Sequence, residues 1–345
     1  MTSITDTIFA VWDLTPNSAG AQARFAELLS SSTTEFSDVD KAQLQTQLAR
    51  TLGLQNHFED AHKLLDEAEQ FFRTEQTKSV ESTPATLKQS FVVLKMRIEL
   101  ERGRVYNSAG MPEHAEPHFL AACEAAASVE KSAGDQDPST IDALEIISYL
   151  KIDALHMLAI VATSNALRVS YANQGIALAR DADRARGRSY TWLGPLLNNL
   201  GWDTLEAGDF KNAIVVFQEA AEVRRDELDL LGGDHSGEEG DKRKRKAFTS
   251  WKIAVWSVGH AQMQAGKEED AYDTLTNLLK QDADGPSIRE DLTHICLWKA
   301  KRSERGEAPE YERMAVEHAK RALELGVDGL KADSLRDIIA KYSNI

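Results

Sequence analysis

Cysteine and proline are scarce in this sequence of 345 residues, which contains two cysteines and eight prolines. Cys123 and Cys296 lie far apart and lack the CxxC spacing of zinc or redox sites, so we expect free buried thiols in a reducing compartment. The low proline content, with abundant Ala, Leu, Glu, Gln, Lys and Arg, favours helices. No convincing run of alternating β-branched and aromatic residues predicts a sheet.

An excess of positive charge, a long apolar run and a leader pattern are also missing. The formal net charge is −15, which argues against non-specific binding to nucleic acid and against docking on anionic membranes. No apolar stretch approaches the roughly 20 residues of a membrane span. Residues 1–20 lack the basic start and apolar block of a signal peptide. We therefore expect a soluble protein of the cytoplasm.

Recognisable motifs for catalysis, cofactors and metals are absent as well. The sequence contains no phosphate-binding loop, dinucleotide-binding, serine-hydrolase or zinc-protease pattern. His114 and His118 are four residues apart and could share a metal, but they supply two ligands at most. The pair His57 and His62 has the wrong spacing for one helical face, and residues 282–285 (DADG) match only the start of a calcium loop. We predict no cofactor, no metal site and no catalytic residue.

What the sequence does contain is a repeated skeleton of small and large residues. It is clearest in 196–225, LLNNLGWDTLEAGDFKNAIVVFQEAAEVRR, and it recurs three times. In each copy a central alanine follows a small residue by 12 positions and a turn residue by 5, and a large apolar residue comes 4 positions later. The small residues are Ala49, Gly103, Gly201 and Gly259; the turn residues are Asn56, Gly110, Gly208 and Gly266; the alanines are Ala61, Ala115, Ala213 and Ala271; the large residues are Leu65, Phe119, Phe217 and Leu275.

Each position of the skeleton has a physical role. A small residue lets two antiparallel helices approach closely, and the large residue fills the space between them. Glycine and asparagine are the residues that most readily adopt positive φ where a helix ends. The skeleton therefore predicts four helix pairs, each with a turn at the Gly or Asn position.

This skeleton resembles the tetratricopeptide repeat (TPR), whose W-x2-L-G-x2-Y … A-x3-F pattern matches at Leu197, Leu200, Gly201, Thr204, Ala213 and Phe217. Leu197 stands where the family has Trp, and no proline closes the units. The central alanines are 44 to 58 residues apart, against 34 in the standard repeat, so we expect long helices or inserted loops at 74–87, 131–140 and 231–246. The basic run Lys242–Lys246 in the last loop is read as a solvated loop, with a nuclear-import signal as the alternative.

The resemblance implies an all-α, right-handed α-solenoid of about six antiparallel helix pairs, with capping helices at both ends. We predict one domain over 1–345, with an N-terminal cap that starts after Thr15–Pro16. The predicted pairs are 38–73, 88–130, 141–182, 189–230, 247–282 and 287–325, and the C-terminal cap is 329–342. The third and sixth pairs match the skeleton more loosely.

The first helix of each pair lines the concave surface of such a solenoid, so equivalent positions predict a groove. The groove candidates are Arg50, Arg104, Asn107, Lys151, Asn198, Trp202, Trp256 and His260. Little acid accompanies them, since only Glu206 lies at the edge of this stripe. Arg, Asn and Trp suit an anionic or aromatic ligand. The alternative is that both Trp residues are core and the arginines form surface ion pairs. Asn198 fits one position of the Lys and Asn set with which some TPR proteins hold a peptide carboxylate, but the rest of that set is missing.

Two functions fit this sequence. The first is a non-catalytic protein-interaction scaffold that binds a peptide or partner segment with acidic or aromatic character in its groove. The alternative is an enzyme or a sensor of a small anionic ligand that uses the same groove. In that case His260 would be the acid or base, with Arg104 and Lys151 as anion anchors.

Overall fold

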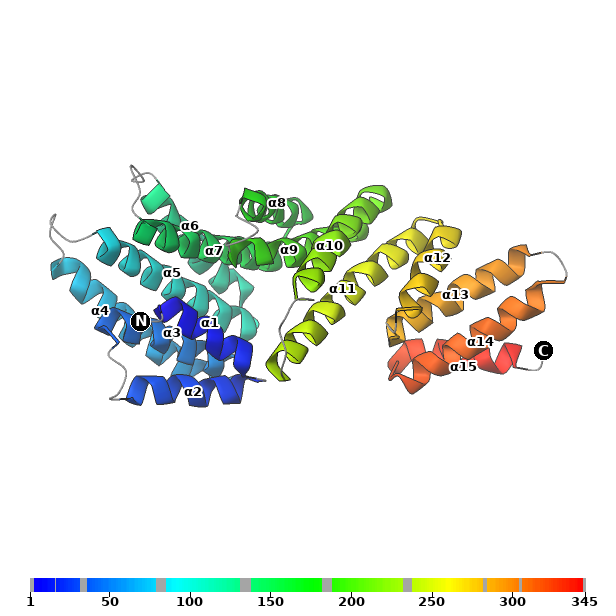
Figure 1. Cartoon of the computed structure of the whole chain (residues 1–345), viewed down its shortest axis with the longest axis horizontal. Helices are drawn as coiled ribbons and strands as arrows, with labels where there is room; N and C mark the ends of the chain where they lie inside the picture. Colours follow the sequence, from blue (N-terminus) through cyan, green and yellow to red (C-terminus); the bar gives the residue numbers. More distant parts are fainter. Residues whose placement is uncertain are drawn as a thin grey trace. The chain divides into compact units, whose positions relative to one another are not determined.

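The structure is a computed structural model that describes residues 3–15, 17–31, 36–78, 85–130, 138–181, 188–231, 238–281, 284–303 and 306–343. These residues form fifteen α-helices and one short 3₁₀ helix, with no strand among them (Figure 1). The all-α class predicted from composition is therefore confirmed. None of these helices is both long and apolar enough to cross a membrane.

The helices follow one another as pairs joined by short turns. Two helices, α1 (Ile4–Leu14) and α2 (Ser18–Ser30), precede the first pair, and α15 (Gly329–Tyr342) follows the last. The short 3₁₀ helix η1 (Arg188–Trp192) comes directly before α9. The pairs are α3 (Asp38–Gly53) with α4 (Phe58–Lys78), α5 (Ala85–Ser108) with α6 (Pro112–Glu130), α7 (Pro138–Val161) with α8 (Asn165–Asp181), α9 (Leu193–Glu206) with α10 (Phe210–Leu230), α11 (Glu238–Gln264) with α12 (Glu268–Leu279), and α13 (Pro286–Arg302) with α14 (Ala308–Glu324).

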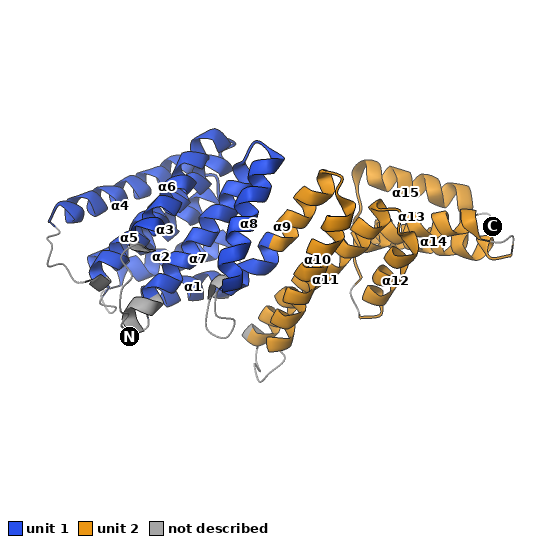
Figure 2. Ribbon diagram, turned by 90° about the horizontal axis from the view of Figure 1, so that it is seen from above, with its two compact units in different colours: residues 1–196 blue, residues 197–345 orange. Residues whose placement is uncertain are grey.

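The chain forms two compact units, residues 1–196 (unit 1) and residues 197–345 (unit 2) (Figure 2). Each unit is a stack of helix pairs and is described by itself. Unit 1 contains α1 to α8, and unit 2 contains α10 to α15 with most of α9. The single domain over 1–345 remains a prediction.

The four predicted turns have the same backbone conformation. Asn56, Gly110, Gly208 and Gly266 adopt φ values of 64°, 77°, 80° and 71°. In each turn the next N–H donates to the carbonyl five residues earlier, the hydrogen bond that ends a helix at a left-handed residue. These bonds run from His57 to Leu52, Met111 to Tyr106, Asp209 to Thr204 and Lys267 to Gln262, at 2.9 to 3.1 Å. The turn predictions are confirmed.

The predicted close approaches between paired helices are also present. A Cβ atom built on Gly201 would lie 2.4 Å from the Phe217 ring, and one on Gly103 would lie 2.5 Å from the Phe119 ring. Gly259 has the same relation to Leu275, at 2.6 Å. A larger side chain at these positions would push the two helices apart, because interiors are close-packed. This contact fixes the first helix against the second in these three pairs.

The three loop predictions and the N-terminal cap prediction were wrong in part. Residues 74–78, 85–87 and 138–140 of the first two predicted loops are helical. The segment 238–246 is the first part of α11, so the basic run Lys242–Lys246 is helical rather than a loop. Lysine and arginine are good helix formers, which explains how this run extends the helix. The N-terminal cap is also longer than predicted, because α1 lies before Thr15. Residues 79–84, 131–137, 232–237 and Pro16 lie outside the described residues.

Candidate binding surface on the first helices

Three of the predicted groove residues of unit 1 line one cavity. Arg50 on α3 and Arg104 and Asn107 on α5 enclose a volume of about 200 Å³. Met157 on α7 completes the wall, and Leu54 lies at the cavity with 55% of its surface exposed. We call the surface formed by these side chains of α3, α5 and α7 the first-helix face of unit 1.

Arg104 is held by two carboxylates that the groove prediction did not include. Its guanidinium donates to Glu101 Oε1 at 2.8 Å and to Asp153 Oδ1 at 2.5 Å. Both acids are buried, with side chains 3% and 6% exposed. Although burial lowers the pKa of Arg104, these two carboxylates outweigh it and raise that pKa. The charge of Arg104 is therefore compensated inside unit 1, and the expectation of a nearly acid-free face was wrong here.

Arg50 is compensated much less. Its nearest carboxylate oxygen is Glu101 Oε1, 3.9 Å away, and a third of its side chain is exposed. Its Cζ lies 4.8 Å from the centroid of the Trp12 ring, and its Nε has no hydrogen-bond partner among the described residues. Burial, followed by the charge of Arg104, lowers the pKa of Arg50. Because this Nε is buried, the terminal guanidinium nitrogens of Arg50, which form no hydrogen bond with the described residues, are the groups open to a ligand.

A third arginine lies near this ion-pair network. We call Arg50, Arg97, Arg104, Glu101 and Asp153 together the ionic layer, and Arg97 gives it an excess of positive charge. Arg97 is 4% exposed, and its Nε donates to Gln43 Oε1 at 3.2 Å. Burial lowers its pKa to about 10, even though Glu101 lies nearby. Together, Arg50, Arg97 and Arg104 provide three positive charges, and the two carboxylates described above provide two negative ones. An anion at the cavity would balance this layer.

Lys151 is not among the residues that line this cavity. On α7 it is Asp153 that contacts Arg104 and Met157 that lines the cavity. Leu155 and Leu158, which follow Lys151 by one and two helical turns, are in the buried core. The register was uncertain in this pair because it has no turn glycine.

In unit 2 the predicted groove residues form an aromatic cluster. The rings of Trp202 on α9 and of Trp256 and His260 on α11 lie 5.5 to 5.6 Å apart, centroid to centroid. Asp291 on α13, only 5% exposed, accepts from Trp256 Nε1 at 2.8 Å. The same carboxylate oxygen lies 3.0 Å from His260 Nδ1. Because a carboxylate only accepts, Nδ1 of His260 carries the proton.

Asn198 lies one turn before Trp202 on α9. Its Oδ1 is buried and has no hydrogen-bond partner among the described residues. Trp202 also packs against Phe217, at 5.3 Å between ring centroids, so it belongs in part to the core. The alternative prediction, that the tryptophans belong to the core, is thus correct for the side of the Trp202 ring that contacts Phe217.

No family model matches this sequence, and no curated protein matches it either. Several solved structures are similar to it. The apo form of RapI is 10% identical, with a TM-score of 0.47 over 90% of this chain and 94% of that chain. A signal transduction ATPase with a TPR sensor, from Pyrococcus horikoshii, is 12% identical with a TM-score of 0.48. That match covers 94% of this chain but only 44% of the ATPase. The TPR domain of P58(IPK) is 12% identical, with a TM-score of 0.32 over 99% of this chain and 81% of that domain.

The fold is a TPR-like helical repeat. This follows from the chain itself, because four helix pairs share one turn conformation, and three of them share one close approach of a small residue to a large one. The TPR-like frame places the residues of the first helices but does not determine their chemistry.

The histidines that were considered for metal binding surround a tyrosine instead. The rings of His62, His114 and His118 lie 4.6, 5.6 and 5.5 Å from the Tyr106 ring. His118 Nδ1 is 2.6 Å from Glu99 Oε2. Across the described ranges, no three His, Cys, Asp or Glu side chains are grouped so that they could hold a metal ion. Of the DADG segment, Asp282 and Ala283 lie outside those ranges, and Asp284 binds Arg289 and Arg321.

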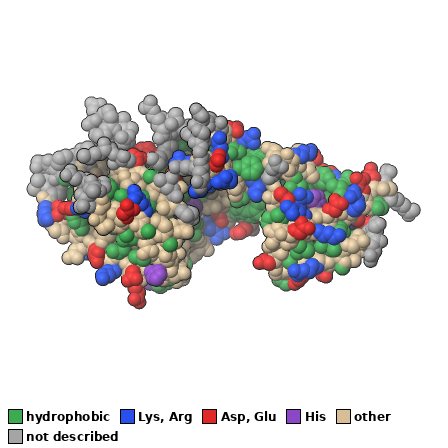
Figure 3. Space-filling view, turned by 60° about the horizontal axis from the view of Figure 1, so that its bottom comes forward, with side chains coloured by type: hydrophobic (Ala, Val, Ile, Leu, Met, Phe, Trp, Pro, Cys, Tyr) green, Lys and Arg blue, Asp and Glu red, His purple; other side chains and the backbone are tan. Residues whose placement is uncertain are grey.

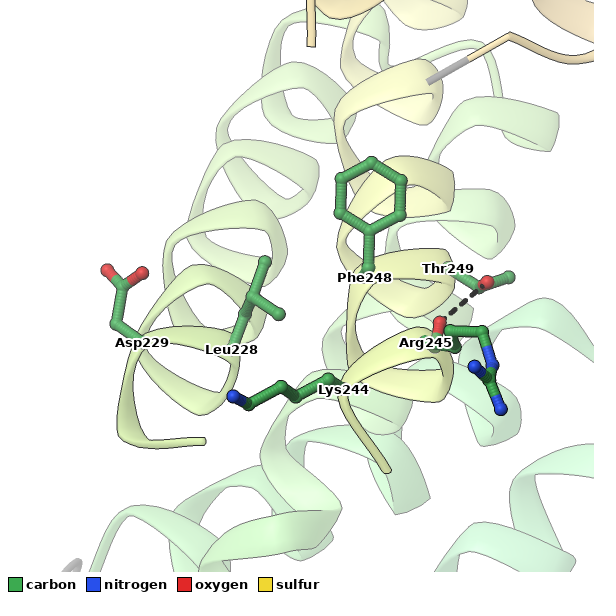
Figure 4. Close-up of a pocket in the computed structure, with 6 residues that line it drawn as sticks. All are labelled: Leu228, Asp229, Lys244, Arg245, Phe248 and Thr249. Carbon is green, nitrogen blue, oxygen red and sulfur yellow. Dashed lines mark hydrogen bonds between the residues drawn. The ribbon is translucent and has the colours of Figure 1, made fainter. Parts of the chain in front are cut away.

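The basic run of α11 borders a larger and more open pocket. Lys244 of α11 extends toward Leu228 and Asp229 of α10 (Figure 4), and Arg245, Phe248 and Thr249 of α11 complete the lining of a volume of about 620 Å³. Thr249 Oγ1 donates to the Arg245 carbonyl at 2.9 Å, so this hydroxyl is engaged within the helix. Both acidic and basic side chains are scattered over the visible surface (Figure 3).

Proposed function

We propose that this protein is a non-catalytic interaction module, and that the first-helix face of unit 1 binds an acidic segment of a partner protein. The observation that carries the proposal is Arg50, which lines the cavity with a third of its side chain exposed and its nearest carboxylate oxygen 3.9 Å away. Together with Arg97, Arg104, Glu101 and Asp153 it forms the ionic layer, which has one more positive than negative charge. A carboxylate is the group that best completes such a layer, because charge-assisted hydrogen bonds to arginine are strong.

The size of the cavity favours a side chain over a whole small molecule. Pockets for drug-sized ligands and cofactors measure about 300–1,000 Å³, whereas this one measures about 200 Å³. An Asp or Glu side chain fits such a volume while the rest of the segment stays on the surface. Leu54 offers exposed apolar contact beside it, and Asn107 and Ser108 offer polar groups for a peptide backbone.

The test is a selection of random peptides of about twelve residues on the full chain, with wild type and Arg50→Gln compared. We expect Asp and Glu to be enriched on the wild type and the enrichment to fall about tenfold on the variant, which corresponds to about 1.4 kcal/mol. Arg50 is preferred to Arg104 for this purpose because removing Arg104 would take a charged partner from two buried carboxylates. Equal enrichment on both proteins would overturn the proposal.

The control is Arg24→Gln, which removes the same charge from unit 1. Arg24 is half exposed on α2 and pairs only with Glu27, at 2.5 Å. We expect this variant to select the same peptides as the wild type. A competition with free glutamate and with inorganic phosphate tests the alternative, a small anionic ligand. Complete displacement of the peptide at an affinity equal to its own would favour that alternative and overturn the peptide proposal.

A further inference from the structure

Helix α1 contacts helices that are not its neighbours in the stack. In a regular helical repeat each unit contacts only the units before and after it. The Phe9 ring of α1, however, packs edge-on against Tyr149 of α7, with ring centroids 5.0 Å apart. Trp12 of α1 donates its indole N–H to Gln47 of α3 at 2.9 Å. Because it reaches both α3 and α7, α1 lies across the first-helix face of unit 1 instead of extending the stack.

Two sets of side chains hold α1. Ile8 and Val11 are 1% and 5% exposed and pack in one cluster with Phe25 and Leu44. This set ties α1 to α2 and α3. Phe9 and Trp12, three residues apart, form the second set and make the contacts with Tyr149, Gln47 and Arg50. Trp12 also packs against Phe25, at 5.7 Å between ring centroids, so it borders the first set. Weakening the second set therefore removes the Phe25 contact of Trp12 but leaves Ile8 and Val11 in the buried cluster.

The chemistry of α1 matches the chemistry of the face on which it lies. Its sequence, ITDTIFAVWDL, contains Asp6 and Asp13 and no Lys, Arg or His. Asp6 accepts from Ser3 Oγ and Asp13 is exposed, so it is the Trp12 ring of this acidic helix that contacts Arg50. The contact between the Trp12 ring and Arg50 is a cation–π interaction, which is worth roughly 0.5–2 kcal/mol.

Arg50 links this helix to the cavity. One side of its guanidinium lies over the Trp12 ring, and the same residue lines the cavity with Arg104 and Asn107. A ligand carboxylate that draws Arg50 into the cavity would weaken its contact with α1. Binding at the cavity and docking of α1 are therefore coupled through one side chain.

We propose that α1 is a built-in competitor, and that the partner segment is an acidic helix that presents two aromatic residues three positions apart, as Phe9 and Trp12 do. This inference rests on the proposed function and names its partner class and its regulation. The partner helix takes the place of the Phe9 and Trp12 side of α1. A tethered segment acts at an effective concentration near millimolar, so α1 lowers the apparent affinity of any partner.

The test uses a fluorescein-labelled peptide of residues 3–15, with anisotropy measured on the full chain. We compare wild type with Phe9→Ala/Trp12→Ala, which removes the second set of contacts and keeps Ile8 and Val11. We expect the double variant to bind the peptide at least about tenfold more tightly than wild type, because its own α1 competes less. A peptide with the same two alanines should not bind. Equal binding of the labelled peptide to wild type and double variant would overturn the inference.

Trp12→Phe provides a second variant in case the double variant is poorly folded. It removes only the indole donor to Gln47 and keeps an aromatic ring. We expect a rise in peptide affinity of about threefold, in line with one lost hydrogen bond. The control is Phe210→Ala/Leu330→Ala, two exposed side chains of unit 2, which should leave peptide binding at the wild-type level. No rise with Trp12→Phe would count against the inference.

The two proposals fail in different ways. If acidic peptides bind through Arg50 but loosening α1 leaves their affinity unchanged, the competitor inference is wrong and the proposed function stands. If the double variant binds the α1 peptide more tightly while acidic peptides bind wild type and Arg50→Gln with equal affinity, the proposed function is wrong. A wild-type dimer that becomes monomeric in the double variant would show that α1 docks between two copies of the chain, which also overturns competition within one chain.

Discussion

The first-helix faces of the two units use the same repeat positions for different chemistry. In unit 1 the positions carry Arg50 and Arg104, with buried Glu101 and Asp153 beside them. In unit 2 they carry Trp202 and His260, and Trp256 lies one turn before His260; Trp256 and His260 share one buried carboxylate. The packing frame is shared, as the turns and the glycine contacts show. The repeated packing of helix pairs therefore determines where side chains lie. The side chains on the first helices determine what each face can bind.

The comparison also explains why we propose the partner site in unit 1. In unit 2, Asp291 accepts from both the Trp256 indole and His260, so one carboxylate satisfies both donors. In unit 1, a third of the Arg50 side chain is exposed at an open cavity, and its nearest carboxylate oxygen lies 3.9 Å away. Asn198 Oδ1 of unit 2 also lacks a hydrogen-bond partner among the described residues, but it carries no charge. The exposed positive charge of Arg50 is why we assign the partner site to unit 1.

The largest expected effect comes from removing a buried acid of each unit. Asp153→Asn takes from Arg104 one of its two charged partners, and we expect a loss of about 3–5 kcal/mol in the free energy of unfolding. Asp291→Asn disturbs hydrogen bonds from Trp256 and His260 and should cost only about 1–3 kcal/mol. Urea unfolding followed by circular dichroism measures both. If Asp291→Asn proved the more damaging, the contrast between an ionic and an aromatic face would be wrong.

A pH effect is expected next, and it lies in unit 2. Burial, followed by the charge of Arg289, lowers the pKa of His318 to about 4, and Arg289 donates to its Nδ1 at 2.9 Å. Glu317 and Asp284 act in the opposite direction but do not outweigh these causes. Because the folded pKa lies below the unfolded value of about 6.5, the stabilisation is complete above pH 6.5 and is lost as the pH falls toward 4, by up to about 3 kcal/mol.

The variant His318→Gln isolates this contribution, since glutamine can still accept from Arg289 without titrating. We expect it to flatten the loss of stability between pH 6.5 and 4. His156 of unit 1 also has a lowered pKa because it is buried, so part of the acid sensitivity should remain. An unchanged pH profile in His318→Gln would assign the acid sensitivity to other groups.

The shared frame predicts equal packing effects in the two units. Gly103→Ala and Gly201→Ala each place a Cβ within 2.5 Å of a buried phenylalanine ring. We expect each to cost about 1–3 kcal/mol through overpacking, with the gain in helix propensity offsetting part of it. Thermal unfolding of the two variants measures this. A much larger cost in one unit would mean that the two frames are not equivalent.

The smallest expected effect on stability is that of Arg50→Gln. The residue is a third exposed and its nearest acid is 3.9 Å away, so we expect a change below about 1 kcal/mol. The control Arg24→Gln should change stability by a few tenths of a kcal/mol. A loss above about 3 kcal/mol for Arg50→Gln would mark Arg50 as a structural residue of the ionic layer rather than a ligand group.

The sequence was sufficient to predict the packing of the helix pairs, because this packing depends on residues that are close together in the sequence. A small residue, a turn residue and a large residue at fixed spacing carry the whole physical requirement of a helix pair, so Gly201, Gly208 and Phe217 could be placed in advance. The chemistry of the faces was less accessible. Glu101 could have been found, because it lies three residues before Arg104 and faces the same side.

Other contacts depend on how separate helices meet. Asp153 lies in a pair without a turn glycine, so its register against α5 could not be fixed from spacing. Asp291 lies in the loosest pair, and no local signal connects it with Trp256, 35 residues earlier. The position of α1 belongs to no repeat, and its contact with Tyr149 spans most of unit 1. Such long-range contacts are set by packing rather than by local pattern.

A double-mutant cycle between Arg50 and the acidic residue of a selected peptide tests the proposed site most directly. Binding is measured by calorimetry for wild type and Arg50→Gln, each with the acidic peptide and with its Glu→Gln or Asp→Asn form. We expect a coupling free energy of about 1–3 kcal/mol, because the carboxylate and the guanidinium meet in a partly buried cavity. Strictly additive effects of the two substitutions would show that the carboxylate does not bind Arg50 and would contradict the proposed function.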